Sequence, residues 1–600
     1  MKKILESLKK LALDFLRTVK EVSIREFKRL PLSVLNRKQW LYLPRLLSKR
    51  EKIILTSLLF FVFVSAATGF GRLYLRITVA KPGNGGTYRE GLLKEPRFIN
   101  PIYASNDADR DIAELVFPGL IRYSPEGEIE PYLAETVDVS DDGKNYTIHL
   151  KNNITWHDGE PLTANDVIFT IKTIQNPEFK SPYRQNWQGV LIEKIDNRTV
   201  RFILRQPYAP FIENLTIGII PEHLWSKIPP QSAPLSDLNL KPIGSGPYIF
   251  DAFTRLADGS VTSYTLTSNR SFFLRRPHLN GIIFKIYPSE TELVAGFRKG
   301  EIDGISTISA KNLPSLQKTT IQIYPLQIPR VVAIFFNEAQ QSAFADKNIR
   351  LALAKAIDTK AIINDVLLGG GEMTSSPIPP GSAGFNPDIP LIGFNPDEAK
   401  SLLEKAGWKN KNENGILIKT QTVKSKKVIT PLKIELTTSD FPELVEVANK
   451  IKDMWRGVGV DLEIKVLTAA SLETMAIRPR AYQALLFGEI FGHDPDPFAF
   501  WHTSQIKDPG LNIALYSNRK VDTLLEEARR TTDELKREEK YREFQKIVAQ
   551  DMPAIFLFSP LSYYGVGAQI KGVIIDRIAL PQERFAHIEN WYTKTSRGLK

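Results

Sequence analysis

The chain has 600 residues, of which 42% are hydrophobic and 24% charged, a balance that is typical of a folded protein and excludes a disordered one. This length is enough for about two or three domains, or for one large body with two lobes. The sequence contains no cysteine, which excludes disulfides, thiolate zinc sites, cysteine-bound iron–sulfur clusters and cysteine nucleophiles.

The positive charge of the chain is concentrated at its N-terminus. The net charge is +12, and residues 1–52 hold 15 Lys and Arg against 5 Asp and Glu, a net of +10. The other 548 residues therefore carry only +2. Because a nucleic-acid binder carries a basic patch on its folded body, this distribution argues against nucleic acid as a partner.

One apolar stretch follows the basic arm. Residues 53–70 contain no charge over 18 positions, near the lower limit for a helix that crosses a hydrocarbon core of about 30 Å. Apolar residues continue beyond Arg72, so we predict a transmembrane anchor over residues 51–77, followed by a flexible linker at 78–87. Since basic residues stay on the cytoplasmic side, residues 1–50 are expected in the cytoplasm and the large body on the extracytoplasmic side of the cytoplasmic membrane.

The anchor and the arm each allow a second interpretation. Residues 65–67 (SAA) are small enough for a signal peptidase, but a signal peptide totals about 15–30 residues, which favours an uncleaved anchor here. Within the arm, apolar residues recur at three- and four-residue steps over residues 4–19. This spacing predicts either a basic amphipathic helix on the anionic inner leaflet or a solvated tail that only fixes the topology.

The first part of the body is rich in strands and turns. Apolar and polar residues alternate over 145–150, 199–204 and 263–267, as in half-buried strands. Between the first two, Thr163 is predicted to cap a helix, with Asp166 three residues later as a short form of the capping box.

Helical spacing becomes more frequent after about residue 305. The predicted elements are, in chain order, a helix at 348–366, a helix from Asn395 to Gly407, a helix at 443–456, a strand at 460–466 and a helix at 521–550. Helix, strand and helix in alternation are typical of an α/β lobe. The sequence thus indicates two lobes that differ in their secondary structure.

Three groups of polar residues invite a catalytic or metal-binding interpretation. Residues 157–159 (HDG) are better explained as a tight turn, and residues 244–247 (GSGP) lack the lysine of a phosphate-binding loop. Histidines and aspartates gather in segment 493–502, but a metal needs three or four convergent ligands with supporting hydrogen bonds. We therefore predict no metal and no cofactor. Without a G-x-S-x-G or H-E-x-x-H motif, the chain is also predicted not to be an enzyme.

Several motifs in fixed order resemble one protein family. They are WHDGEPLTANDVIF at 156–169, GSGPYIF at 244–250, FRKGEIDG at 297–304, FFNEA at 335–339, IRLALAKAID at 349–358, NPDEAKSLLEKAGW at 395–408 and DPDPFAFWHTSQ at 494–505. Over roughly residues 85–590, the chain resembles the large extracytoplasmic solute-binding proteins of ABC importers for oligopeptides, dipeptides and nickel, known as bacterial solute-binding protein family 5.

This resemblance implies an α/β, bilobal periplasmic-binding-protein fold of the type II, large peptide-binding class, with a hinge and an interlobe cleft. Residues 88–305 and 551–600 would form lobe 1 and residues 306–550 lobe 2, and two crossovers would permit closure around a ligand. The implied function is the capture of oligopeptides by a monomeric receptor. The implied partners are the permease and ATPase subunits of an importer.

The resemblance also implies where the ligand is bound. In many peptide-binding relatives, an aspartate in a cleft loop pairs with the α-ammonium group of the ligand. At the position where those relatives have this aspartate, the present chain has His493, and Asp494 follows one residue later. The implied ligand-binding residues are Glu95, Pro96, Arg97, Phe336, Asn337, Phe491, His493, Asp494 and Asp496.

Two other functions stay open at this point. The ligand could be a nickel chelate, haem or a sugar instead of a peptide, an alternative that His493 motivates. The fold could also serve a non-transport surface receptor or chaperone, because a receptor tethered only for import does not need fifty residues on the inner side.

Overall fold

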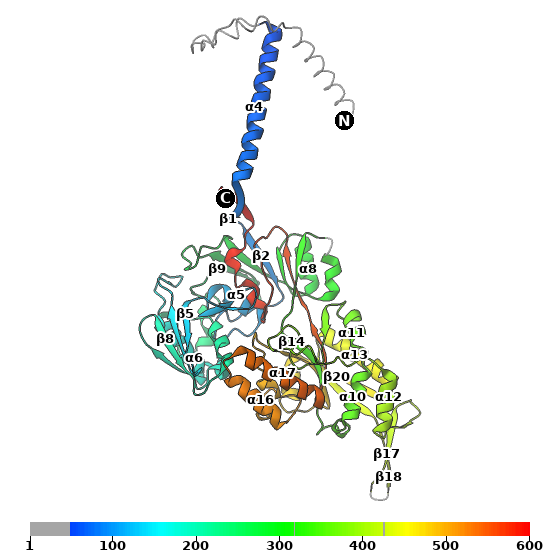
Figure 1. The fold of residues 1–600 in the computed structure, drawn as a ribbon. Coiled ribbons are helices and arrows are strands. Elements are labelled where there is room, and N and C mark those ends of the chain that lie inside the picture. The colour runs from blue at the N-terminus through cyan, green and yellow to red at the C-terminus, as the bar shows by residue number, and fades with distance from the viewer. Residues whose placement is uncertain (1–47, 317–318, 424–425, 600) are drawn as a thin grey trace. The chain divides into compact units, whose positions relative to one another are not determined.

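The computed structural model describes residues 48–316, 319–423 and 426–599 (Figure 1). The cytoplasmic arm predicted at 1–50, with its apolar spacing at 4–19, lies outside these residues except for its last three. Among the described residues, contacts divide the chain into two compact units, residues 48–81 with 597–599 and residues 82–596.

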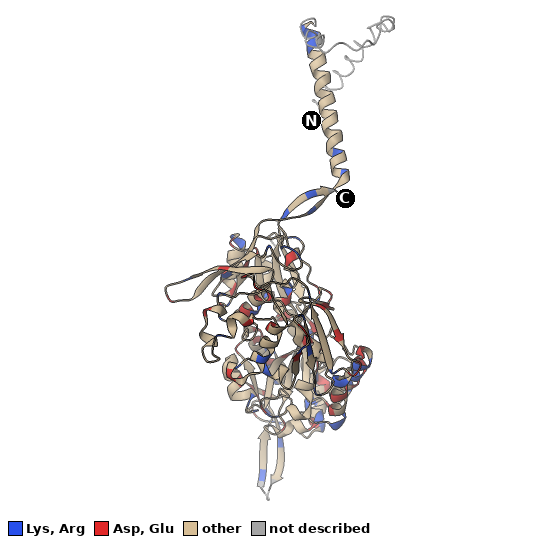
Figure 2. Cartoon of the chain, turned by 90° about the vertical axis from the view of Figure 1, so that its left-hand side faces the viewer, with Lys and Arg blue, Asp and Glu red and all other residues tan. Residues whose placement is uncertain are grey.

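Helix α4 (Lys49–Ile77) is the apolar segment of the first unit. Its part from Lys52 to Ile77 has 26 residues, a mean hydropathy of 2.2 and no buried surface. At 1.5 Å per residue this part is about 39 Å long, enough for a hydrocarbon core of about 30 Å. Basic residues lie toward both ends of the helix (Figure 2). Length and composition fit the membrane span predicted at 51–77, and they would equally fit a signal sequence.

Strand β1 (Thr78–Gly83) follows this helix and pairs with β24 (Lys594–Leu599) in a two-stranded sheet. Gly85 and Gly86, with φ values of +123° and +86°, then lead into β2 through backbone conformations that favour glycine. The linker predicted at 78–87 therefore contains an ordered strand and ends where β2 begins.

Two large mixed sheets form the framework of residues 82–596. The first has the strand order β13-β23-β12-β2-β11-β10-β9 and the second the order β15-β22-β14-β21-β19-β20. In the first, β2 is parallel to both of its neighbours; in the second, β19 is parallel to both of its neighbours while β14 is antiparallel to both of its own. The first-sheet strands are β2 (Thr87–Leu92), β9 (Tyr248–Arg255), β10 (Val261–Ser268), β11 (Gly281–Ile286), β12 (Gly304–Ile308), β13 (Ile321–Leu326) and β23 (Ser562–Gly567). The second-sheet strands are β14 (Arg330–Phe336), β15 (Gly371–Met373), β19 (Lys433–Ser439), β20 (Asp461–Leu467), β21 (Ala484–Ile490) and β22 (Ala554–Pro560).

The chain passes between the two sheets twice. It crosses from β13 to β14 at residues 327–329 and returns from β22 to β23 through Leu561. We call residues 82–326 with the return segment 562–596 the first lobe, and residues 330–560 the second lobe. The predicted α/β fold with two lobes and two crossovers is confirmed. The crossovers lie later in the chain than the predicted positions 305 and 550. Strands β12 and β13 still pair within the first sheet, and β22 still pairs within the second. Closure of one lobe against the other stays a prediction.

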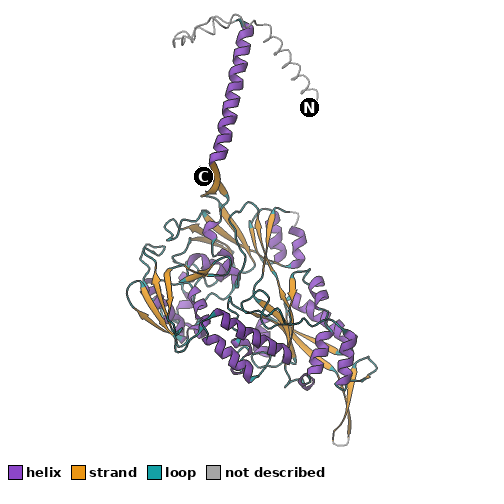
Figure 3. Cartoon of the chain, in the orientation of Figure 1, coloured by secondary structure: helices purple, strands orange, loops and turns teal. Residues whose placement is uncertain are grey.

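Helices cover both faces of the second sheet (Figure 3). On one face, Val332 and Ile334 of β14 pack with α10 to α13; on the other, Val331 and Ala333 pack with α16 and α17. Because alternate residues of a strand point to opposite faces, a strand buried on both sides is apolar at every position, as β14 is after Arg330. These helices are α10 (Lys347–Lys355), α11 (Thr359–Asp365), α12 (Pro396–Lys405), α13 (Pro442–Gly457), α16 (Arg519–Arg530) and α17 (Glu534–Asp551). Smaller elements of this lobe are β16 (Asn410–Lys411), β17 (Leu417–Val423), β18 (Lys426–Pro431), α14 (Ala469–Leu472) and α15 (Phe498–Trp501).

In the first lobe, one core joins the first sheet to a smaller four-stranded sheet. Helices α5 (Asp107–Val116) and α6 (Ala164–Gln175) contribute apolar residues to it. The smaller sheet is formed by β5 (Ala134–Val139), β6 (Asn145–Leu150), β8 (Thr199–Ile203) and β7 (Leu191–Lys194), in that order. Other elements are the hairpin β3 (Ile121–Tyr123) and β4 (Ile129–Pro131), α7 (Glu222–Trp225), α8 (Glu290–Arg298) and α9 (Leu313–Leu316). The three strands predicted in this lobe are confirmed as β6, β8 and β10.

Two helices predicted as continuous are each broken in two. Asp358 caps α11 and Asp533 caps α17, each by accepting a hydrogen bond from a backbone amide three residues later. Such a cap satisfies amides that have no partner at a helix start, so an aspartate within a helical pattern can begin a new helix. The prediction of one continuous helix at 348–366 and of another at 521–550 is therefore wrong, because each range holds two helices.

The predicted capping box of α6 is confirmed. We expect its contribution to the free energy of unfolding to be measurable. The Thr163 amide donates to Asp166 Oδ2 at 2.8 Å, and the Thr163 hydroxyl accepts from the Asn165 amide at 3.3 Å. Thr163→Ala removes the hydroxyl acceptor and should lower the free energy of unfolding by about 1 kcal/mol, measured by urea denaturation of the full chain. Thr163→Ser keeps the hydroxyl and should lose less. Equal stability of the alanine variant and the wild type would contradict the role of the cap.

Candidate ligand-binding site

A cavity of about 430 Å³ has walls from both lobes. Residues of α5, β3 and the return segment line it from the first lobe, and residues 490–493, at the end of β21, line it from the second. A second hollow of about 910 Å³ adjoins it. Both volumes lie within the about 300–1,000 Å³ that is usual for small-ligand sites. The residues that line both hollows are Asn186, Glu213, Asn214, Ile490, Phe491 and Gly492.

Ion pairs fix the loop at residues 491–496 to the helices of the second lobe. The Asp494 carboxylate lies 3.0 Å from Arg537 Nε of α17 and accepts a hydrogen bond from the Tyr541 hydroxyl at 3.0 Å. Asp496 pairs with Arg529 of α16, with 2.7 Å between Oδ2 and Nη2. Both carboxylates of this loop therefore already have cationic partners within the second lobe.

The same loop contacts the first lobe across the cavity. The ring of His493 stacks on that of Tyr123 with centroids 3.6 Å apart, and His493 Nε2 lies 2.9 Å from Glu583 Oε2. The amide of Asp494 donates to Glu213 Oε1 at 2.5 Å. These contacts hold the two walls of the cavity together, and none of them is covalent.

Two glutamates that line the smaller cavity have high pKa values. Burial raises the pKa of Glu213 to about 8; the amide of Asp494 opposes this rise, whereas the charges of Asp494 and Glu583 add to it. Burial also raises the pKa of Glu114 to about 8, with Glu583 adding to the rise and Arg122 opposing it. At pH 7 both carboxyls are therefore mostly protonated.

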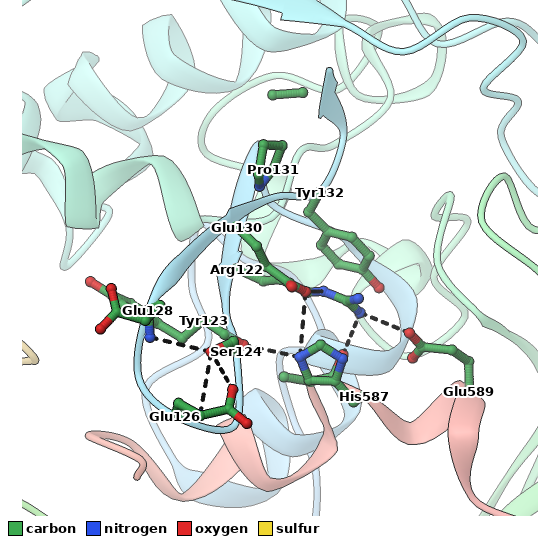
Figure 4. A network of polar contacts seen from close by, with 12 residues as sticks. Arg122, Tyr123, Ser124, Glu126, Glu128, Glu130, Pro131, Tyr132, His587 and Glu589 are labelled. Atoms are coloured by element: carbon green, nitrogen blue, oxygen red, sulfur yellow. Dashed lines mark hydrogen bonds and ion pairs between the residues drawn. The ribbon is translucent and has the colours of Figure 1, made fainter. Parts of the chain in front are cut away.

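Arg122 fastens the β3–β4 hairpin to the return segment (Figure 4). Its guanidinium donates to Glu130 at 2.5 Å and to Glu589 at 3.0 Å, and it lies 4.4 Å from the centroid of the Tyr132 ring. His587 Nε2 lies 3.2 Å from a backbone carbonyl of β3. This network keeps the hairpin residues that line the cavity in a fixed position.

Some of the predicted ligand-binding residues line these hollows. Phe491 and His493 line the smaller one, and Phe491, Asp494 and Asp496 line the larger one. The structure thus brings the four residues of this loop together at the interface between the lobes.

The other predicted ligand-binding residues, Glu95, Pro96, Arg97, Phe336 and Asn337, line neither hollow. Glu95 accepts a hydrogen bond from an amide of β10 at 3.0 Å and lies 3.3 Å from the guanidinium of Arg97. Phe336 and Asn337 are each 1% exposed, and the Asn337 side-chain amide donates to a backbone carbonyl at 2.9 Å. Contact of these five residues with a ligand stays a prediction.

The HDG and GSGP motifs form one structural unit. His157 Nδ1 accepts a hydrogen bond from the Gly244 amide at 3.1 Å, and its Nε2 lies 3.1 Å from the Gly246 carbonyl. A Cβ at Gly244 would lie 1.9 Å from the carbonyl oxygen of Val116, so only glycine allows this close approach to the end of α5. Gly159, with φ +94°, makes the predicted turn. Among the described residues, no group of three or more His, Cys, Asp or Glu could hold a metal ion.

Sequence reasoning missed most of the charges in the smaller cavity. Besides His493, the charged residues that line it are Arg110, Glu114, Arg122, Glu213 and Glu583. The first two offered a signal, because they lie four residues apart on one face of a helix that is otherwise largely buried. For Glu213 and Glu583 we find no signal in the sequence, since only the fold brings them to the loop after β21.

Comparison with known proteins identifies relatives of this chain. The family model described as bacterial extracellular solute-binding proteins, family 5, middle region, matches residues 128–510. The oligopeptide-binding protein AppA of Bacillus subtilis is 27% identical over 540 residues, which cover 88% of this chain and 96% of AppA. The dipeptide-binding protein of Escherichia coli is 26% identical over 474 residues, 75% of this chain and 84% of that protein.

Solved structures show the same fold. That of AppA from Bacillus subtilis in complex with a nonapeptide has a TM-score of 0.69 at 27% identity and covers 85% of this chain and 99% of that one. That of NikZ from Campylobacter jejuni in complex with Ni(L-His) has a TM-score of 0.70 at 26% identity and covers 84% and 99%. These structures confirm the two-lobed fold inferred from the sequence.

Replacing Glu213 with glutamine should change how stability depends on pH. Between the ordinary value of 4.5 and about 8, the folded carboxyl holds a proton that the unfolded one has released. The free energy of unfolding of the wild type therefore falls as pH rises through this window, by up to about 1.4 kcal/mol per pH unit from this group. Glutamine does not titrate and keeps a carbonyl acceptor for the Asp494 amide.

We expect Glu213→Gln to gain stability relative to the wild type as the pH is raised from about 5 to about 8, measured by urea denaturation. Glu404→Gln, on the exposed surface of α12, is the matched control and should follow the wild type. The same pH dependence in Glu213→Gln and the wild type would show that burial does not raise this pKa.

Proposed function

This chain belongs to family 5 of the bacterial extracellular solute-binding proteins, and we propose on that premise that it captures oligopeptides outside the cytoplasmic membrane for an ABC importer. Its relatives are solute-binding proteins, and the chain is not an enzyme. Likeness to the oligopeptide-binding protein AppA, whose solved structure holds a nonapeptide, supports peptides as the solute class. Likeness to the dipeptide-binding protein of Escherichia coli supports the same class.

The observation that carries this proposal is a cavity walled by both lobes. A ligand reaches such a site when the lobes separate, and the crossovers at 327–329 and Leu561 are the two places where the backbone would bend. Separation would break the contacts of the loop at 491–496 with the first lobe, and the contact of Arg529 on α16 with the ring of Tyr208. Closure would then exclude water, which strengthens hydrogen bonds between the protein and the peptide backbone.

The adjoining hollow of about 910 Å³ suits a binder of varied peptides. Its lining combines aromatic residues such as Tyr208 and Phe498 with charged ones such as Arg529. Ordered waters can bridge between a ligand side chain and such a wall at little cost in affinity, so side chains of different size would be accepted.

A metal chelate is the second candidate ligand. The solved structure of NikZ, similar in fold, holds Ni(L-His), and His493 places an imidazole in the wall of the smaller cavity here. His493 Nε2 is already 2.9 Å from Glu583, and coordination through this nitrogen would require that contact to break. In peptide capture this contact breaks when the lobes separate and can re-form when they close, so peptide capture is the function we favour.

We expect the full chain, purified in detergent without added ligand, to carry co-purified peptides. Native mass spectrometry followed by denaturing release should show a series of peptide masses. Asp494→Ala should reduce the retained amount, because it removes the ion pair with Arg537 that fixes the loop, and Glu404→Gln should not. The opposite result would be a protein that retains no peptide and binds none from a mixed peptide library but retains nickel–histidine. This result would contradict peptide capture and identify a metal chelate as the ligand.

We further propose that the receptor acts as a monomer beside permease and ATPase subunits and stays attached to the membrane through α4. The length and apolar surface of α4 support the anchor. Net charge supports the orientation, because residues 1–52 carry +10 and basic segments stay in the cytoplasm.

This orientation can be tested with single cysteines, because the chain has none of its own. In right-side-out membrane vesicles, Ser315→Cys in the exposed part of α9 should react with a membrane-impermeant maleimide, and Ser33→Cys in the arm should react only after the vesicles are opened. Labelling of both in sealed vesicles would refute the orientation. An intact mass that lacks α4 would show a cleaved signal sequence.

A further inference from the structure

Two charged side chains in the smaller cavity have no partner within the described residues. Arg110 and Glu114, both on α5, line the cavity, and neither side chain makes a hydrogen bond or an ion pair there. The other charged residues of the lining are each engaged. Their contacts are those of Arg122 with Glu130 and Glu589, of Glu213 with the Asp494 amide, and of His493 with Glu583.

The order of the two residues along the helix is the less favourable one for an ion pair between them. Residues four apart lie on the same helix face, and an acidic residue placed N-terminal to a basic one pairs better than the reverse. Glu526 pairs with Arg530 at 3.6 Å and Glu538 with Arg542 at 3.2 Å, both in the favourable order. On α5 the arginine comes first, and the two charges stay separate.

Helix α5 is fixed from its other sides, so these two side chains start from a rigid backbone. Asp111 pairs with Arg584 at 2.6 Å, and both side chains are at most 2% exposed. Asp109 accepts hydrogen bonds from the backbone amides of Arg97 and Phe98 at 2.6 and 2.9 Å. Preorganisation of this kind lowers the conformational cost of binding a ligand.

Keeping Glu114 without a partner in a half-buried position costs free energy, which argues for a role in binding. The groups that act on it are Glu583 and Glu589 of the return segment, Arg122 of β3 and Asp111 of its own helix. Burial, which is the largest cause, and the three carboxylates raise the pKa of Glu114 to about 8, while Arg122 opposes the rise. A cation bound beside this carboxyl would lower that pKa again and release a proton at pH 7.

We propose that Arg110 and Glu114 bind the two ends of a dipeptide, with Glu114 accepting hydrogen bonds from the α-ammonium group and Arg110 donating to the α-carboxylate. Four residues of helix advance about 6 Å. Two residues of extended peptide span at most about 7 Å. The two charged ends of a dipeptide can therefore lie next to the oppositely charged side chains of Glu114 and Arg110. The cavity volume of about 430 Å³ suits a ligand of this size better than a long peptide.

This inference rests on peptide capture as the function, narrows the ligand from oligopeptides in general to dipeptides, and names the residues that select them. It differs from recognition of the ligand by Asp494, whose carboxylate is engaged by Arg537 and Tyr541. Charge pairs of this kind discriminate strongly, because a site built for a charged group leaves its own group unpaired when the ligand lacks it.

Isothermal titration of the detergent-purified full chain with alanyl-alanine, N-acetyl-alanyl-alanine, alanyl-alanine amide and tetra-alanine tests the assignment. The wild type should bind alanyl-alanine best and lose roughly 10–100-fold in affinity when either end is blocked. Glu114→Gln should bind alanyl-alanine as weakly as the acetylated form and no longer distinguish the two. Arg110→Gln should fail to distinguish the free acid from the amide.

Two further measurements separate a binding role from a structural one. Titration at pH 7 in buffers of different ionisation enthalpy should show close to one proton released per alanyl-alanine in the wild type and none in Glu114→Gln. Asp107→Asn, an exposed change in the first turn of α5, is the matched control and should behave as wild type in both assays. Thermal unfolding of each variant verifies that α5 stays folded.

The outcomes distinguish this inference from the function on which it rests. Unchanged affinity and unchanged discrimination in both α5 variants would overturn the inference and leave peptide capture intact, as would binding of tetra-alanine but not alanyl-alanine. Failure of the wild type to bind any peptide would overturn peptide capture, and the inference with it.

Discussion

The candidate binding site depends on the buried guanidinium of Arg584. It lies 2.6 Å from Asp111 of α5 and 3.1 Å from Glu90 of β2, and all three side chains are at most 2% exposed. Removing one member of such a group leaves a charge buried without compensation, at a cost of about 3–5 kcal/mol. The hydroxyl of Tyr564, on the strand that follows the second crossover, also donates to Glu90. One ion pair network therefore ties together a helix, a central strand and the return segment.

Two of the first-lobe walls of the smaller cavity, α5 and the return segment, are held together by this network. Glu583 precedes Arg584 in the chain and reaches the cavity, where it meets His493. Arg110 and Glu114 flank Asp111 on α5 and line the same cavity. The second lobe adds one loop, held by its own ion pairs to α16 and α17. Each lobe thus fixes its own wall, while the contacts between the walls are few and separable, as a cleft that opens and closes requires.

Local signals in the sequence predicted the elements well wherever a local cause fixes them. Strand alternation located β6, and the pairing of Thr163 with Asp166 located the start of α6. The same kind of local cause was overlooked at Asp358 and Asp533, where a cap divides what apolar spacing alone describes as one helix. The crossovers were placed too early because strand membership depends on a partner strand that is distant in the sequence.

The sequence by itself determined the two-lobed α/β class, the apolar N-terminal helix and the loop with His493 and Asp494, because composition, periodicity and ordered motifs are properties of neighbouring residues. Only the tertiary structure decided which charges face the cavity. Glu114, Glu213 and Glu583 come from three separate parts of the chain and meet because the return segment packs against α5 and the loop after β21. The high pKa values of Glu114 and Glu213, and whether a side chain has a partner, follow from burial and from neighbours that no local pattern encodes.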